Sequence, residues 1–206
     1  MQSYILTVLI GYIFGCFQAS YILGKIVKKV DIRSLGNGNA GASNAVNTLG
    51  WKFGIVVALV DIGKATLSIL IMKVLLQGSV RPEQLPFFLY LNGLFVILGH
   101  NYPFYMGFKG GKGTASLIGM LVAIDGRIAL LCIIAILIVT IVTDYIALGT
   151  IGLLIVLVLS TLYFQYSIGC VIIALVIAAQ SIYKHIPNIH NIRRGTESGL
   201  RKALKK

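Results

Sequence analysis

Long apolar stretches separated by short polar segments are the feature that most limits what this chain can fold into. A helix that crosses the hydrocarbon core of a bilayer needs about 20 predominantly apolar residues, and several stretches here approach or exceed that length. Hydrophobic residues make up 57% of the 206 residues and charged residues only 12%, which is typical of a polytopic membrane protein. The sequence therefore predicts an all-α transmembrane helix bundle, with residues 1–206 as one integral membrane domain.

Seven spans are predicted, of which the first two and the last two have the strongest apolar signal. A five-span arrangement that omits an adjacent pair of the weaker central segments would keep the same parity. The predicted spans are residues 4–23, 53–76, 85–98, 117–124 (with the preceding 114–116), 128–142, 145–164 and 168–183.

The charge balance is strongly positive, with 18 Lys and Arg against 6 Asp and Glu. No base-stacking aromatic pattern accompanies the basic residues, so no nucleic-acid partner is expected. With seven spans, fourteen cations fall on one side of the membrane and only Arg81 and Arg127 on the other, while Lys64 and Lys73 lie within the second span. The positive-inside rule then places the basic side in the cytoplasm, the N-terminus outside and the C-terminus inside.

A glycine-rich cationic segment, GHNYPFYMGFKGGKGTAS, occupies residues 99–116 between two apolar stretches. Lys109 and Lys112 flank Gly110 and Gly111, and glycine lets backbone N–H groups converge on an anion. The pattern predicts a phosphate or carboxylate site, although a solvated turn with topology-setting lysines is the alternative. It is not a P-loop, because Gly113 follows Lys112 where that motif has Ser or Thr.

A second polar segment, residues 28–51, is too polar to span and too rich in Gly and Asn for a stable helix. The amides of Asn37, Asn39 and Asn44 can both donate and accept, and Gly38 allows a tight turn between them. This composition suits polyol hydroxyls and phosphate oxygens, with an ordinary connecting loop as the alternative.

The third polar segment is the tail, residues 184–206. His185 and Asn188 would share a face if the last helix continues, although Pro187 disfavours helix at the residue before it. Beyond Gly199 a basic end lying on anionic lipid is preferred.

Asp61 and Lys64 lie three residues apart inside the second predicted span, so they share a helix face. Ionisable groups at that depth need a partner or a wet cavity. A mutual ion pair is the favoured interpretation, and lining a site is the alternative. Cys16, Cys132 and Cys170 lie in apolar surroundings and are expected to pack rather than to form disulfides or bind metal.

Together, the three polar segments resemble the cytoplasmic motifs of the bacterial acyl-phosphate:glycerol-3-phosphate acyltransferases, the PlsY family. The similar stretches are DIR with GNGNAGASN, then GHNYPFYMGFKGGKG, then HIPNI followed by GTE, and Leu49-Gly50 and the Asp61/Lys64 pair match too. The resemblance implies a seven-helix bundle in the inner membrane and a role in phospholipid synthesis. It implies transfer of an acyl chain from acyl phosphate to the sn-1 hydroxyl of glycerol 3-phosphate, giving lysophosphatidic acid and phosphate.

The same resemblance implies no metal or other cofactor and an active site facing the cytoplasm, with membrane lipids as neighbours and no obligate protein partner evident. The expected catalytic residues are Lys109, His185 and Asn188, with Lys109 stabilising charge on the departing phosphate or the oxyanion. The expected substrate-binding residues are Asn37, Gly38, Asn39, Asn44, His100, Gly110, Gly111, Lys112, Arg193 and Glu197. The His-x4-Asp arrangement of acyl-coenzyme A acyltransferases is absent, so either a substrate phosphate or His185 takes the hydroxyl proton.

Three positions depart from the family pattern. Asn37 stands where Ser is usual, and Asn47 and Asn191 stand where Arg is usual. Two potential bidentate phosphate clamps are thereby lost, and Arg193 is a candidate replacement for one of them. A non-catalytic or altered-acceptor lipid-binding paralogue therefore remains an alternative. A small anion carrier is disfavoured, because polar residues within the spans are scarce beyond Asp61 and Lys64.

Overall fold

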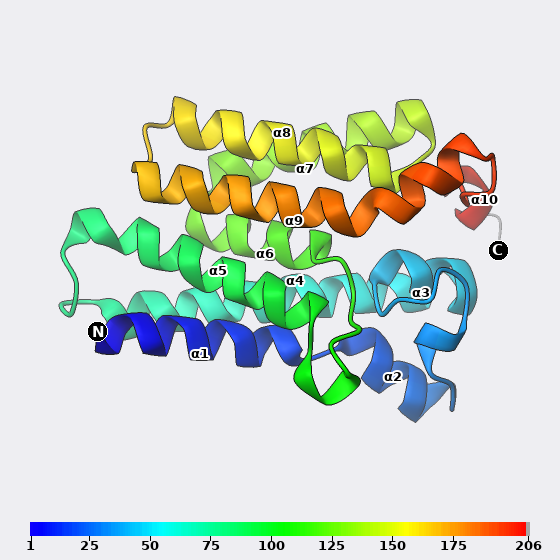
Figure 1. Ribbon diagram of the computed structural model, residues 1–206, viewed down its shortest axis with the longest axis horizontal. Coiled ribbons are helices and arrows are strands. Elements are labelled where there is room, and N and C mark those ends of the chain that lie inside the picture. The colour runs from blue at the N-terminus through cyan, green and yellow to red at the C-terminus, as the bar shows by residue number, and fades with distance from the viewer. Residues whose placement is uncertain (205–206) are drawn as a thin grey trace.

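The computed structural model describes residues 1–204, and these residues form a bundle of helices without any strand (Figure 1). The all-α membrane fold predicted from hydropathy is confirmed. The helices are α1 (Gln2–Cys16), α2 (Ala19–Val27), α3 (Ala42–Leu49), α4 (Trp51–Leu76), α5 (Leu85–Asn101), α6 (Thr114–Ile124), α7 (Gly126–Thr143), α8 (Ile146–Tyr163), α9 (Ile168–Arg193) and α10 (Leu200–Leu204), with short 3₁₀ turns η1 (Ile32–Ser34), η2 (Pro82–Gln84) and η3 (Phe104–Met106).

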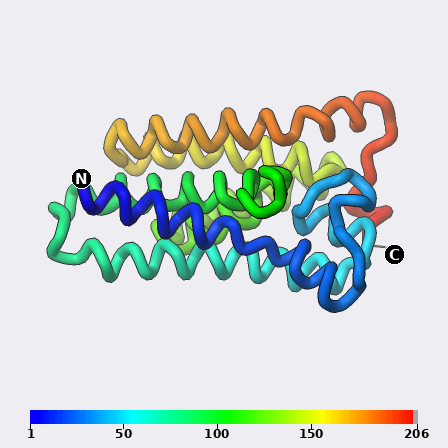
Figure 2. Tube along the Cα trace, turned by 60° about the horizontal axis from the view of Figure 1, so that its bottom comes forward, coloured from blue at the N-terminus to red at the C-terminus, as the bar shows by residue number. Residues whose placement is uncertain are grey.

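The long helices run roughly parallel to one axis, with α1, α4 and α5 on one side of α6 and α7, α8 and α9 on the other (Figure 1). Helix α6 packs against α4, α5 and α7, while α1 packs on α5 and α8 packs on both α7 and α9. Fully buried side chains such as Tyr90, Met120 and Leu153 join these helices in one apolar core. Helix α1 begins at one end of the bundle and α10 lies at the other (Figures 1 and 2).

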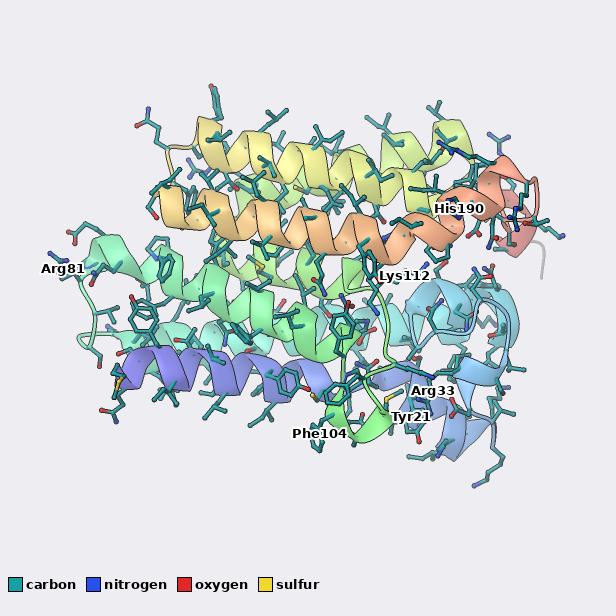
Figure 3. The ribbon with its side chains drawn as sticks, viewed as in Figure 1. Tyr21, Arg33, Arg81, Phe104, Lys112 and His190 are labelled. Atoms are coloured by element: carbon teal, nitrogen blue, oxygen red, sulfur yellow. The ribbon has the colours of Figure 1, made fainter. Side chains whose placement is uncertain are left out.

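Each predicted span coincides with helical residues of the bundle, although the first is divided between α1 and α2 and the fourth is the short α6. Within residues 1–204, five segments are long and apolar enough to cross a membrane: residues 2–27, which combine α1 and α2, together with α4, α7, α8 and α9. Seven crossings and their orientation stay predictions. We call the end of the bundle that carries α2, α3 and α10 the polar end, and Figure 3 shows Arg81 at the opposite end from Arg33 and His190.

The first span is not the continuous helix that was predicted, because it breaks at Phe17 and Gln18 between α1 and α2. The break frees carbonyl groups that the helix would otherwise satisfy. The Nζ atom of Lys64 donates to the carbonyl oxygens of Gly15 at 3.2 Å and Phe17 at 2.6 Å, and Gln18 Nε2 donates to the His100 carbonyl at 2.8 Å. Tertiary partners therefore stabilise an interruption that hydropathy alone does not reveal.

The segment at 28–51 also differs from the prediction, because residues 42–49 form α3 despite their content of Asn, Ser and Thr. Helix α3 lies directly against α4, where a Cβ atom on Gly54 would come within 2.1 Å of Val46 Cγ2. Tertiary packing at this close approach overrides weak local propensity. The tail likewise contains more helix than expected, since α9 continues through Pro187 to Arg193.

Helix α6 has 11 residues and measures only about 16 Å. It lies in the middle of the bundle (Figure 1), and its first residues, Thr114 and Ala115, line a cavity. Its side chains Leu117, Met120 and Leu121 are almost fully buried. This short, sheltered helix matches the predicted fourth span. Because it starts deep, it leaves space at the polar end for a recessed cavity.

Candidate active site

A cavity of about 290 Å³ opens at the polar end and is lined by residues from all three polar segments. The sequence predicts that residues 28–51, 99–116 and 184–206 together form one binding site. Segments lying far apart would have contradicted that prediction. Of the predicted site residues, the cavity is lined by Asn37, Asn39, Asn44, His100, Lys112, His185, Asn188 and Glu197.

Lys112, Asn188 and Glu197 form a hydrogen-bonded chain across the cavity. The Nζ atom of Lys112 donates to Oδ1 of Asn188, and Nδ2 of Asn188 donates to Oε1 of Glu197 at 2.6 Å. Burial lowers the pKa of Lys112 to about 8, with the Glu197 carboxylate opposing the shift and Lys184 adding to it. The loop lysine is therefore a cation that is poorly solvated and ready to pair with an anion. Figure 3 shows Lys112 inside the bundle, between α9 and α3.

Helix N-termini add further positive potential to the cavity. Its lining includes Ala42 and Ser43 at the start of α3, Thr114 and Ala115 at the start of α6, and Ile146 at the start of α8. The first turn of a helix presents N–H groups without intrahelical partners and carries the positive end of the helix dipole. Three such termini and one lysine make the pocket suited to phosphate.

Asn44 organises the asparagine-rich segment. Its Nδ2 donates to the carbonyl oxygens of Ile32, Leu35 and Asn39 at 2.9–3.1 Å, and its Oδ1 accepts from the N–H of Asn37 at 2.8 Å. The side chain is 2% exposed. Its amide is thus committed to the backbone, and it shapes the loop that presents Asn37 and Asn39 to the cavity.

The first two polar segments are also joined directly. Arg33 Nη1 donates to the Met106 carbonyl at 2.9 Å, and the Ala40 N–H donates to the Gly110 carbonyl at 3.2 Å. Asp31 holds the Arg33 guanidinium at 2.8 Å, and this hydrogen bonding lowers the pKa of Asp31. These contacts hold the asparagine-rich segment against the glycine-rich one.

Gly110 and Gly111 serve a different purpose from the one expected. Their N–H groups donate to the carbonyl oxygens of Asn101 at 3.1 Å and His100 at 3.0 Å, so they are occupied and do not converge on an anion. A Cβ atom at Gly111 would lie 2.1 Å from His100 Nε2, and one at Gly110 would lie 2.1 Å from the His100 carbonyl oxygen. These glycines let the loop fold back tightly on the end of α5.

Asp61, Lys64 and His100 form a buried cluster of ionisable side chains. Lys64 Nζ lies 2.8 Å from Asp61 Oδ1 and 2.9 Å from His100 Nδ1, and the Nδ1 and Oδ1 atoms lie 3.5 Å apart. The ion pair favoured from sequence is confirmed. Asp61 and His100 also line the cavity, whereas Lys64 does not, so the alternative interpretation holds for Asp61 alone.

His185 is buried on α9 and lines the cavity. Its Nδ1 lies 2.8 Å from the Ser181 carbonyl oxygen, an atom that can only accept, so Nδ1 carries the proton and Nε2 is left as the acceptor of the neutral ring. His185 and Asn188 share the buried face of α9, as their spacing predicted.

Other predicted residues lie outside the lining. Lys109 and Arg193 are exposed, and Gly38 occupies a left-handed turn at φ 68° beside the cavity residues Asn37 and Asn39. Arg193 therefore lies outside the cavity lining, and its role as a replacement for a missing arginine stays a prediction. Among the three departures, Asn37 and Asn47 line the cavity, and Asn191 donates from Nδ2 to Glu197 Oε2 at 3.3 Å.

Sequence reasoning missed the small residues that the helix starts bring to the cavity, such as Ser43, Thr114 and Ser198. The Gly-x-Ser pattern at 41–43 and the Gly-Thr pair at 113–114 resemble helix starts and could have indicated them. The apolar part of the lining was not predicted either. It includes Ile55, Ala58 and Ile62 on α4 and Ile118 on α6.

Comparisons with known proteins agree with this geometry. The family model described as glycerol-3-phosphate acyltransferase matches residues 5–195. Glycerol-3-phosphate acyltransferase 1 of Oceanobacillus iheyensis is 49% identical over 92% of this chain and 91% of the relative, and the enzyme of Shouchella clausii is 37% identical over 97% of both.

Two solved structures of PlsY, an integral membrane glycerol 3-phosphate acyltransferase, share the fold. The glycerol 3-phosphate form has a TM-score of 0.86 at 32% identity and covers 96% of both chains. The lysophosphatidic acid form has a TM-score of 0.83 at 30% identity, over 99% of this chain and 100% of that one. With three polar segments meeting in one cavity and this likeness along nearly its whole length, the chain belongs to the glycerol-3-phosphate acyltransferase family of integral membrane enzymes.

Proposed function

We propose that this chain transfers an acyl group from acyl phosphate to the sn-1 hydroxyl of glycerol 3-phosphate, at the cytoplasmic face of a bacterial inner membrane. The hydroxyl oxygen bonds to the acyl carbon, and the bond between that carbon and the phosphate oxygen breaks. The products are lysophosphatidic acid and inorganic phosphate, and the hydroxyl proton leaves to a base. No metal or organic cofactor takes part.

The proposal is based on one observation, that a single cavity has both a polar side and an apolar side. Its polar side holds Lys112 and the helix N-termini, and its apolar side holds Ile55, Ala58 and Ile118. Ile55 is also 47% exposed on the bundle surface, so the apolar side reaches the lipid-facing surface of α4. A phosphate-bearing acceptor and a fatty acyl chain can thus be held side by side, which converts their reaction into an intramolecular one.

We assign the charge-stabilising role to Lys112, because its ammonium faces the cavity and already contacts Asn188. It would offset the charge of two phosphates and stabilise the oxyanion of the transition state. The catalytic role of Lys109 stays a prediction. Asn37 and Asn39 would bind glycerol or phosphate oxygens, and His185 with Asn188 would orient the substrates.

Two proton acceptors remain open, a substrate phosphate and Nε2 of His185. Acyl phosphate is an activated donor, so a weak base suffices. The neutral ring of His185 has its acceptor nitrogen unused by the Ser181 contact, so it is competent for either role.

The proposal is tested by giving the purified protein acyl phosphate and glycerol 3-phosphate and measuring lysophosphatidic acid. We expect product from acyl phosphate and none from acyl-coenzyme A. K112A should abolish turnover. K109A tests the catalytic role predicted for Lys109, and near-normal turnover of this variant would exclude that role. Turnover only with acyl-coenzyme A would reject the donor, and turnover only with another polyol phosphate would indicate an altered acceptor. No turnover with any donor would indicate a non-catalytic paralogue.

The orientation is supported by the charge bias, because the polar end carries the basic loops and Arg81 lies at the other end (Figure 3). All three cysteines are buried and free, so single introduced cysteines can report the side. We expect a membrane-impermeant maleimide to label K109C only in inside-out vesicles and R81C only in right-side-out vesicles. The reverse pattern would invert the assignment.

A further inference from the structure

The chain just after the family-matched region forms part of the cavity wall. Residues 5–195 match the family model, yet Ser198, Gly199, Leu200 and Ala203 line the cavity, and Ala203 is only 4% exposed. Residues beyond 199 are predicted to be a basic end lying on anionic lipid. In the structure Ala203 is buried against the cavity while Arg201 and Lys202 are exposed, so contact of the basic side with lipid stays a prediction. Figure 1 shows α10 at the polar end, beside the end of α9.

Asp144 holds this segment in place. It lies in the turn between α7 and α8, more than fifty residues earlier in the chain. Its carbonyl oxygen accepts from the Leu200 N–H at 2.8 Å, and its Oδ1 accepts from the Arg201 N–H at 2.8 Å. A Cβ atom on Gly199 would come within 2.0 Å of Asp144 Oδ2, so only glycine lets the carboxylate approach this closely. Asp144 itself does not line the cavity.

The anchored segment begins directly after Glu197, which holds Asn188 at 2.6 Å, and Asn188 in turn contacts Lys112. Glu197 therefore lies in a segment that is held at both ends, by α9 before it and by the contacts of Asp144 after it. If the second anchor is released, Glu197 and the wall at 198–203 lose their fixed position, and water gains access to the polar side of the cavity.

We propose that Asp144 is a positioning residue for the acyl transfer, which acts by holding residues 198–203 as a wall that excludes water from the acyl donor. The inference rests on the proposed function. In the competing reaction that the wall suppresses, a water oxygen bonds to the acyl carbon and the bond to the phosphate oxygen breaks, giving a fatty acid, phosphate and a proton. The wall thereby favours transfer to the glycerol hydroxyl over hydrolysis.

The backbone of Asp144 allows a clean test. Its φ of 70° is left-handed, a conformation that glycine and asparagine adopt readily. D144G removes the carboxylate without backbone strain, and D144N keeps an oxygen at the position of the acceptor for the Arg201 N–H. D125A is the matched control, because Asp125 accepts from the Arg127 N–H at the start of α7, at the opposite end of the same helix.

We expect D144G to raise the ratio of free fatty acid to lysophosphatidic acid about fivefold and to raise KM for glycerol 3-phosphate by a similar factor, because loss of positioning weakens the proximity effect. Its melting temperature should stay close to that of the wild type. Hydrogen exchange at the Arg201 amide, which loses its carboxylate acceptor, should accelerate. D144N and D125A should keep the wild-type product ratio.

The inference is overturned if D144G keeps the wild-type product ratio and KM. It is also overturned if D144N is as impaired as D144G and both variants have lowered melting temperatures, because that result would indicate a purely structural role. Unchanged amide exchange in D144G would also overturn it. Hydrogen exchange needs no donor, and the product ratio can be measured with whichever donor the wild type accepts. A wrong donor assignment would therefore be recognised separately, by the wild-type assay alone.

Discussion

Asn188 donates from Nδ2 to Oε1 of Glu197 at 2.6 Å, within the wall of the cavity. Through its other amide atom it accepts from Lys112, so one neutral side chain separates a cation from an anion. A direct ion pair between the lysine and the glutamate would neutralise the ammonium that phosphate needs. The amide instead orients both groups and leaves the lysine charge available to the substrate.

Substitution N188D should therefore be far more harmful than its size suggests. The new carboxylate would face Glu197 across 2.6 Å and would pair with Lys112, so we expect kcat/KM to fall about 100-fold, the cost of about 2.7 kcal/mol. Adding E197Q should recover part of the loss, because an amide there can donate to the new carboxylate. Additive effects of the two substitutions in steady-state kinetics would contradict the coupling.

The binding of glycerol 3-phosphate should weaken as pH rises through the pKa of Lys112, which burial lowers to about 8. Below this pH the ammonium is charged and attracts phosphate, and above it the charge is lost. The second pKa of the substrate phosphate is about 6, so the phosphate is already dianionic at the pH values where Lys112 loses its charge.

We expect KM in the wild type to rise up to about tenfold per pH unit above the transition. K112R keeps its charge throughout and should have a flat profile, whatever its absolute activity. KM measured from about pH 7 to about pH 9.5 checks this, and a wild-type profile as flat as that of K112R would exclude Lys112 from phosphate binding.

Replacing Lys64 should destabilise the bundle strongly. K64M would leave Asp61 as a buried charge without its 2.8 Å partner and would strip a donor from the carbonyl groups of Gly15 and Phe17. We expect a loss of about 3–5 kcal/mol in the free energy of unfolding, with K64M/D61N less affected than K64M alone. K52M, at an exposed position of α4, is the control. Equal unfolding transitions for the two lysine variants in detergent would refute the role of Lys64.

Two glycine-to-alanine substitutions should have opposite effects on stability. In G111A the new methyl group would lie 2.1 Å from His100 Nε2, so the loop or the ring must move, and we expect a loss of about 1–3 kcal/mol together with lower activity. Gly63 is a helical residue with open space around it, so G63A should gain up to about 1 kcal/mol. Thermal unfolding of both variants checks the pair, and a stabilised G111A would contradict the described loop.

His185 can be tested as the base through H185Q, which keeps a polar side chain on the same face of α9. If a substrate phosphate accepts the proton, we expect kcat at saturating substrates to stay within about tenfold of the wild type, because only orientation suffers. The pH dependence of kcat should then also be retained. A loss of about 100-fold or more, with KM unchanged, would assign the proton transfer to His185.

The helical fold and the location of the site were accessible from sequence because both follow from strong local rules. Backbone groups in a bilayer must be paired within the segment, so long apolar stretches become helices. Polar, glycine-rich and basic segments stand out against such stretches, and the motifs around Asn37, Lys112 and His185 were recognisable from residue type and order alone. The pairing of Asp61 with Lys64 followed from helical spacing.

Tertiary structure decided what these rules do not reach. Lys109 and Lys112 have the same chemistry and nearly the same neighbours, and only the fold of Gly110 and Gly111 onto the end of α5 leaves one exposed and the other facing the cavity. The break after α1, the helix at 42–49 and the hold of Asp144 on residues 200 and 201 depend on partners distant in the chain. The local sequence determines which backbone conformations have low free energy, and long-range contacts select among them. A single buried hydrogen bond or close approach can do this because the differences in local preference are small.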